Sequence, residues 1–251
     1  MKHLVPTHPP THTPLAAPNQ QKTTSVYWNE RAKRKYYYKN EEFYTTTPIP
    51  YYYRRRKIIL KKIEKLIAAN KCAEICDFGC GDGEYIKHLY KPDINFYGLD
   101  ASVEMINEAK TRMSTLTDNK ISFEVSSEGL GINKDFDLIY SSAVWAHISN
   151  EEARKLFNNI YRHIKDEGLF IICEQTAPYY YEGHNYIRRT GTQYSDLLKE
   201  AGFEVVEAEY IDFWLHRILF EYRFVKKLCN RKSVLNSDEF RIQLKKNFGI
   251  D

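Results

Sequence analysis

Residues 73–84 read AEICDFGCGDGE, a short apolar run that leads into an acid and three alternating glycines. The apolar residues predict a buried strand, and Gly79, Gly81 and Gly83 let the backbone turn sharply and approach a ligand closely, because they have no Cβ. The helix that we expect from about Glu84 offers free N–H groups at its start. This strand–loop–helix unit predicts a ligand site at the end of the strand.

A second predicted strand, 94–99, runs into Asp100, seventeen residues beyond Gly83. In doubly wound sheets an acid at this place accepts hydrogen bonds from ribose hydroxyls. Asp77, just before the glycines, suits an ammonium group better than a pyrophosphate, and the glycine spacing differs from the dinucleotide pattern. We therefore expect a nucleoside with an attached cationic group, bound across the ends of the first two strands.

Apolar strands and amphipathic helices alternate along the chain. The strands that we expect are 73–78, 94–99, 121–125, 136–141, 169–174 and 203–211. The helices that we expect are an apolar stripe at 54–69, one from Glu84, one capped by Ser102, one with a Ser149–Glu152 capping box and one around 195–201. This alternation predicts an α/β fold with a doubly wound, mostly parallel sheet, covered by helices on both faces.

Four segments together resemble the class I S-adenosylmethionine-dependent methyltransferases, over roughly residues 54–212. They are the glycine loop, the GLDAS turn at 98–102, the FDLI strand at 136–139 and IKDEGLFIICE at 164–174. The resemblance implies a Rossmann-like fold, methyltransferase activity, the cofactor S-adenosyl-L-methionine and the product S-adenosyl-L-homocysteine. It implies no metal.

The resemblance also assigns roles by position. Asp77 holds the methionine amino group, Asp100 takes the ribose hydroxyls, and Ala101 lies near adenine. Ser126 stands where the family often has an adenine-binding acid, and Ser141 lies beside the methionine portion. The predicted cofactor-binding set is Asp77, Phe78, Gly79, Cys80, Gly81, Gly83, Asp100, Ala101, Ser126 and Ser141.

His147, six residues beyond Ser141, is the predicted catalytic base, although a histidine packed at a helix start fits the pattern equally well. Glu174 and His184 are weaker candidates. Arg188 and Arg189 either clamp an anionic acceptor or form a solvated pair, and we favour the solvated pair.

We expect a small-molecule or sugar-type acceptor, with oxygen slightly preferred over nitrogen. The preference rests on tyrosine triplets at 36–38, 51–53 and 179–181, and on the absence of the Asn/Asp-Pro-Pro-Tyr/Phe motif of base-amino methyltransferases. Two basic flanks, 31–66 with 12 Lys/Arg against three acids and 216–247 with nine against three, keep an RNA or protein acceptor open. A cofactor-binding regulator without catalysis is a third alternative.

Composition sets the remaining expectations. The proline-rich residues 1–25 predict a disordered tail, and 26–251 form one domain with a helical lid (27–56), a core (57–212) and a C-terminal extension (213–251). No apolar stretch is long enough to span a membrane. Five cysteines without a Cys-x-x-Cys pair favour a reduced, cytoplasmic protein.

Overall fold

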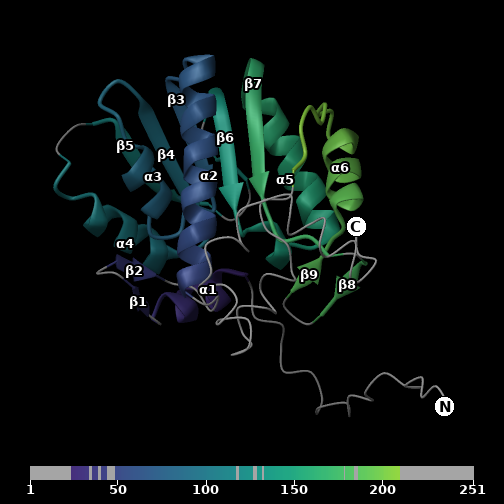
Figure 1. Ribbon diagram of the computed structural model, residues 1–251, viewed down its shortest axis with the longest axis horizontal. Coiled ribbons are helices and arrows are strands. Elements are labelled where there is room, and N and C mark those ends of the chain that lie inside the picture. The colour runs from purple at the N-terminus through teal and green to yellow at the C-terminus, as the bar shows by residue number, and fades with distance from the viewer. Residues whose placement is uncertain are drawn as a thin grey trace, which may run out of the picture.

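The computed structural model describes residues 24–33, 36–38, 41–43, 49–116, 119–126, 129–131, 133–177, 179–183 and 186–209. Its centre is a five-stranded parallel sheet in the order β5-β4-β3-β6-β7 (Figure 1). The strands are β3 (Glu74–Phe78), β4 (Asn95–Asp100), β5 (Ile121–Val125), β6 (Phe136–Ser142) and β7 (Ile164–Cys173). Two small antiparallel pairs join β1 (Tyr36–Tyr38) to β2 (Glu41–Phe43) and β8 (Tyr181–Glu182) to β9 (Ile187–Arg188).

Helices cover both faces of the sheet. They are α1 (Thr24–Ala32), α2 (Ile49–Asn70), α3 (Glu84–Leu89), α4 (Val103–Arg112), the 3₁₀ turn η1 (Trp145–His147), α5 (Asn150–Arg162) and α6 (Gly191–Glu200). Apolar side chains of α2, α3 and α4 pack on the sheet face of Ile75, whereas those of α5 and α6 pack on the face of Cys76. Adjacent residues of β3 thus serve opposite layers, as the period of a strand requires. The predicted doubly wound α/β fold is confirmed.

The strand order reverses between β3 and β6. These two strands are neighbours in the sheet, although β4 and β5 lie between them in the chain. Ligands of open parallel sheets bind at such a switch point, beyond the carboxyl ends of the strands. In Figure 1 the arrows of β6 and β7 point toward the end of the sheet where α1 and β1 lie. The described part of the predicted lid therefore lies at the end of the sheet where the glycine loop emerges.

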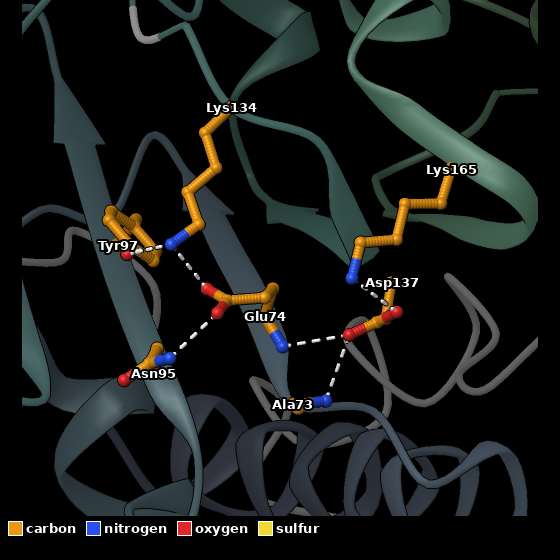
Figure 2. Close-up of polar contacts among 7 residues, drawn as sticks. All are labelled: Ala73, Glu74, Asn95, Tyr97, Lys134, Asp137 and Lys165. Atoms are coloured by element: carbon orange, nitrogen blue, oxygen red, sulfur yellow. Dashed lines mark hydrogen bonds and ion pairs between the residues drawn. The ribbon is translucent and has the colours of Figure 1, made fainter.

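The opposite end of the sheet is held by a polar network (Figure 2). Oδ2 of Asp137 accepts the amides of Ala73 and Glu74 at 2.9 and 2.8 Å, and Lys165 donates to Oδ1 at 2.9 Å. Lys134 forms an ion pair with Glu74 at 2.8 Å. Burial by itself raises the pKa of Asp137, but the bonds from Lys165 and the two amides outweigh burial and hold the pKa below its usual range. These contacts fix the starts of β3, β6 and β7.

Several predicted boundaries change. α2 begins at Ile49, so 49–56 of the predicted lid belong to a helix that continues into the core, and α1 begins at Thr24, inside the predicted tail. The predicted strand over 203–211 is wrong for 203–209, which form no strand. The amide of Phe203 instead bonds to the carbonyl of Leu198 at 3.0 Å and closes the end of α6. The predicted extension over 213–251 and most of the predicted tail lie outside the described residues.

Within the described ranges, no helix is both long and apolar enough to cross a membrane. The same residues contain no group of histidine, cysteine and acidic side chains that could hold a metal ion.

Candidate active site

The glycines of the loop after β3 serve different purposes. Gly79, Gly81 and Gly83 all have positive φ, at 77°, 54° and 73°, which favours glycine at each position. A Cβ at Gly79 would lie 2.3 Å from Cγ2 of Val144, so this glycine is required for packing. A Cβ at Gly81 would meet no atom within 4 Å. Gly81 therefore borders open space, where a ligand can approach the backbone.

Asp100 closes β4 and is tied to this loop. Its Oδ2 accepts the amide of Gly81 at 2.9 Å, and its Oδ1 accepts the amide of Ser102 at 2.8 Å. Burial raises the pKa of Asp100, while these backbone bonds oppose the rise. Each carboxylate oxygen has two lone pairs, so each can accept a further bond from a ligand hydroxyl. The structure thus brings the predicted ribose acceptor beside the glycine loop.

Asp77 is buried at the end of β3, opposite Tyr140 of β6 in the strand register. Oδ2 of Asp77 and the hydroxyl of Tyr140 are both buried, and neither has a hydrogen-bond partner among the described residues. Burial raises the pKa of Asp77 well above its usual range; the nearby Tyr140 hydroxyl opposes this, and Asp100 and Asp82 add to it. A buried carboxylate oxygen without a hydrogen-bond partner is costly unless a ligand supplies a donor or a cation.

The other predicted cofactor residues surround this centre. The Ser126 hydroxyl donates to the carbonyl of Gly129, and its amide bonds to the carbonyl of Asp100 at 2.9 Å. Ser141 is buried, and its hydroxyl accepts the indole N–H of Trp145 at 2.7 Å. Ser141 thus holds the turn after β6. Phe78 and Cys80 are buried, Gly83 lies at the start of α3, and Ala101 is half-buried.

His147 ends η1, inside a cluster of aromatic rings. Its half-buried imidazole stacks on Tyr27 with centroids 5.7 Å apart, and meets Trp28 and Tyr186 edge-on at 5.0 and 5.5 Å. We call these three rings with His147 the His147 cluster. Tyr27 and Trp28 belong to α1, so this helix reaches one side of the site.

The same helix also reaches the other side of the site. Ser102 donates a 2.5 Å hydrogen bond to the side chain of Asn29 on α1. Because Ser102 follows Asp100, α1 links the end of β4 to the turn that carries His147. The sequence placed α1 in a lid, but it carried no signal for the partners of Tyr27, Trp28 and Asn29.

Among the weaker candidates, Arg188 and Arg189 behave differently. Arg188 is exposed, whereas Arg189 is fully buried, so the predicted solvated pair is wrong for Arg189. The Arg189 guanidinium binds the carbonyls of Trp145 and Ile148, each at 2.6 Å, and is not open to an acceptor. Glu174 accepts the amide of Trp145 at 2.7 Å, and His184 lies outside the described residues.

Two ion pairs that the sequence did not indicate fix the surroundings of the loop. Arg56 of α2 pairs with Glu84 at the start of α3, and both side chains are buried. Arg112 of α4 pairs with Asp82 inside the loop. These contacts anchor the loop on both sides and hold α2 against α3.

The protein family described as "Methyltransferase domain" matches residues 51–208, which is more than half of the chain. The chain belongs to the class I S-adenosylmethionine-dependent methyltransferases. The cofactor of this methyltransferase is S-adenosylmethionine. The match begins in the first turns of α2 and ends beyond α6, so it covers the whole central sheet.

The chain also resembles individual proteins, at less than 30% sequence identity. The phosphoethanolamine N-methyltransferase of Plasmodium falciparum (isolate 3D7) is 28% identical over 205 residues, which cover 71% of this chain and 74% of that protein. Phosphoethanolamine N-methyltransferase 1 of Triticum aestivum is 29% identical over 150 residues, 54% of this chain and 29% of that protein. A solved SAM-dependent methyltransferase from Leishmania major shares the fold, with a TM-score of 0.54, 17% identity and coverage of 64% of this chain and 70% of that one.

Proposed function

We propose that this methyltransferase transfers a methyl group from S-adenosylmethionine to the nitrogen of a small amine of the phosphoethanolamine class. The observation that carries the proposal is the His147 cluster, which places three aromatic rings around an imidazole at the carboxyl end of the sheet. Aromatic faces attract ammonium groups, and successive methylation leaves the nitrogen cationic. Both curated relatives described above carry this acceptor in their names.

Most of the predicted cofactor residues keep the roles that the resemblance gave them, and Ser141 takes a different one. Asp100 accepts the ribose hydroxyls, and Asp77 faces the methionine ammonium, which supplies the cation that its buried Oδ2 lacks. Gly81 lets the cofactor approach the backbone, while Phe78, Gly79, Cys80 and Gly83 shape the loop. Ala101 and the backbone of Ser126 border adenine. Ser141 acts through Trp145, whose indole it holds.

His147 serves as the base for an amine acceptor. When bound, S-adenosylmethionine supplies an electrophilic methyl group on a sulfonium that is already a good leaving group. An ammonium nitrogen has no free electron pair, so one of its protons must leave before it can attack the methyl carbon. His147 accepts this proton, and the rings of Tyr27 and Trp28 exclude water from the nitrogen.

Apart from the base, the protein contributes to catalysis by aligning the acceptor with the cofactor. An in-line displacement needs the nitrogen, the methyl carbon and the sulfur on one axis, and such positioning supplies about 7–11 kcal/mol of barrier lowering. The link from Ser102 through α1 to the His147 cluster supports this role, because it joins the cofactor side of the site to the acceptor side.

We prefer nitrogen to oxygen because both curated relatives are named as N-methyltransferases and one of the three tyrosine triplets is exposed. The oxygen preference rested partly on the tyrosine triplets. In the triplet at 179–181 the side chains are exposed by 64%, 38% and 52%, whereas Tyr52 and Tyr53 of another triplet are half-buried. Exposed rings of this kind do not line a closed acceptor pocket. Tyr27 and Tyr186, which do contact His147, belong to none of the triplets.

Transfer of a labelled methyl group tests the proposal. Phosphoethanolamine, ethanolamine, a catechol and a simple sugar are offered separately to the purified protein. We expect transfer to phosphoethanolamine and its monomethyl product, and none to the hydroxyl acceptors. Transfer to the catechol or the sugar alone would contradict the amine assignment, and cofactor binding without transfer to any acceptor would favour the non-catalytic regulator.

A further inference from the structure

We propose that Arg189 and Glu174 are positioning residues that clamp the η1 turn from its two sides and so fix His147 for catalysis. The inference rests on the role of His147 in the proposed function. Neither residue touches the reacting atoms, because both bind the backbone of the turn.

The η1 turn is only weakly stabilised by its own backbone hydrogen bonds. It contains three residues, and its backbone bonds are long: His147 N to Val144 O is 3.2 Å and Ile148 N to Trp145 O is 3.4 Å. A single turn of 3₁₀ helix has poor hydrogen-bond geometry and little stability alone. External contacts must therefore set the orientation of the imidazole.

Arg189 holds the carbonyl side of the turn. Its Nη1 and Nη2 donate to the carbonyls of Trp145 and Ile148, both at 2.6 Å, so the guanidinium spans the two ends of the segment that contains His147. Its Nε donates to Oδ1 of Asn150 at 2.7 Å, and the group lies 5.5 Å from the ring centre of Tyr194. A guanidinium offers its donors in one rigid plane, so this fork fixes two carbonyls at once.

Glu174 holds the amide side. Its Oε2 accepts the amide of Trp145 at 2.7 Å, and its Oε1 accepts the amide of Gln175 at 2.9 Å. Gln175 in turn accepts the hydroxyl of Tyr186 at 2.8 Å, and Tyr186 packs edge-on against His147. The same short segment after β7 thus orients the turn and one ring of the cluster.

Both aromatic and ionisable groups surround the turn. Tyr27 and Trp28 from α1 and Tyr186 beside β9 present rings, whereas Arg189 after β9 and Glu174 after β7 present ionisable groups. No carboxylate lies within ion-pair distance of the buried Arg189 among the described residues. The turn is thus held between a buried cation on its carbonyl side and a carboxylate on its amide side.

Matched variants test the clamp. We compare Arg189→Gln, Arg189→Lys, Glu174→Ala and Glu174→Gln with His147→Ala, measuring kcat, the KM for phosphoethanolamine and the cofactor affinity. Arg154→Gln, which removes an exposed arginine that pairs with Glu200 on the surface, is the control. Thermal unfolding of each variant identifies those that have lost the fold.

We expect Arg189→Gln to lower kcat at least tenfold, while the Kd for S-adenosylmethionine stays within twofold. The KM of Arg189→Gln for phosphoethanolamine stays within twofold of the wild-type value, because the clamp positions the base and does not bind the acceptor. Glu174→Gln keeps an acceptor for the Trp145 amide and recovers most of the turnover that Glu174→Ala loses. Arg154→Gln behaves as wild type. If Arg189→Gln does not fold, Arg189→Lys and the Glu174 pair provide the same comparison.

Wild-type turnover in Arg189→Gln, alongside an impaired His147→Ala, would overturn the clamp and leave the proposed function standing. Wild-type turnover in His147→Ala would instead overturn the base role in the proposed function, and the clamp with it. Equal losses in Glu174→Gln and Glu174→Ala would contradict the part assigned to the Trp145 amide.

Discussion

The amide of Gly81 donates a 2.9 Å hydrogen bond to Oδ2 of Asp100 and so ties the glycine loop to the end of β4. The bond fixes the carboxylate with lone pairs left over, next to a backbone position that no side chain covers. A ligand that lies along Gly81 therefore meets Asp100 in a defined orientation.

Alanine substitutions at Gly79 and Gly81 distinguish a glycine that is needed for packing from one that is needed for the approach of the ligand. Each change places a Cβ in the left-handed region, which costs about 1–2 kcal/mol. Gly79→Ala adds the overlap with Val144, whereas Gly81→Ala meets no protein atom. We expect Gly81→Ala to fold with a small loss of stability and a loss of cofactor affinity of at least tenfold, and Gly79→Ala to be the less stable variant. Urea unfolding and calorimetry measure the two effects; full cofactor affinity in Gly81→Ala would contradict the role of this glycine.

Asp77→Asn is expected to stabilise the protein without cofactor and to weaken cofactor binding. The folded-state pKa of Asp77 lies well above its usual value of about 3.9, so wild-type stability falls as the pH rises from there toward the raised pKa. Asparagine does not ionise, so its advantage is absent at low pH and grows as the pH rises. At pH 8 we expect a midpoint higher by at least about 2 °C, the equivalent of roughly 1 kcal/mol.

Asp93→Asn, at an exposed position, is the control for this comparison. Its unfolding midpoint at pH 8 should equal that of the wild type. Cofactor addition should stabilise wild type more than Asp77→Asn. A variant that gains no stability at pH 8 and binds the cofactor normally would remove Asp77 from the site.

The pair of Arg56 and Glu84 is a buried ion pair, and breaking it leaves a charge without its partner. We expect Arg56→Met to lower the free energy of unfolding by about 3–5 kcal/mol, and the double variant with Glu84→Gln to recover much of the loss. The exposed pair of Arg154 and Glu200 provides the comparison, where Arg154→Met should cost less than about 1 kcal/mol. Equal losses at the two pairs, measured by urea unfolding, would count against the anchoring of α2 on α3.

His147→Ala tests the base directly. A general base contributes about 10²–10⁴ in rate, so turnover with phosphoethanolamine should fall within that range while the Kd for S-adenosylmethionine stays unchanged. Unchanged turnover would make His147 a packing residue, the alternative that the sequence left open.

The order of strands and helices could be predicted because each signal is local. A short apolar run closed by glycines predicts a strand end, and β3, β4 and β5 match their predicted ranges within a residue at either end. The start of α2 was missed, although Pro50 in its first turn is a known helix-start signal. The strand over 203–209 failed because alternating residues do not say whether a neighbouring strand is present to pair with them.

Only part of the site could be predicted, because the signals in the sequence are local. Asp77, Gly81 and Asp100 lie on two adjacent strand ends, so spacing along the chain brings them together. Tyr27, His147 and Tyr186 are far apart in sequence, and only the tertiary fold makes them neighbours. Arg188 and Arg189 are the same residue type, so the sequence cannot distinguish them. Arg188, the last residue of β9, is exposed, whereas Arg189, the next residue, is buried.

Calorimetric titration of S-adenosylmethionine into wild type and Asp100→Ala measures whether this carboxylate holds the ribose, with Asp93→Ala as the control and circular dichroism as the check of folding. We expect a Kd more than tenfold weaker for Asp100→Ala, since each bond to a charged acceptor contributes about 1.5–3 kcal/mol, and an unchanged Kd for Asp93→Ala. Equal affinities for wild type and Asp100→Ala would contradict this role of Asp100.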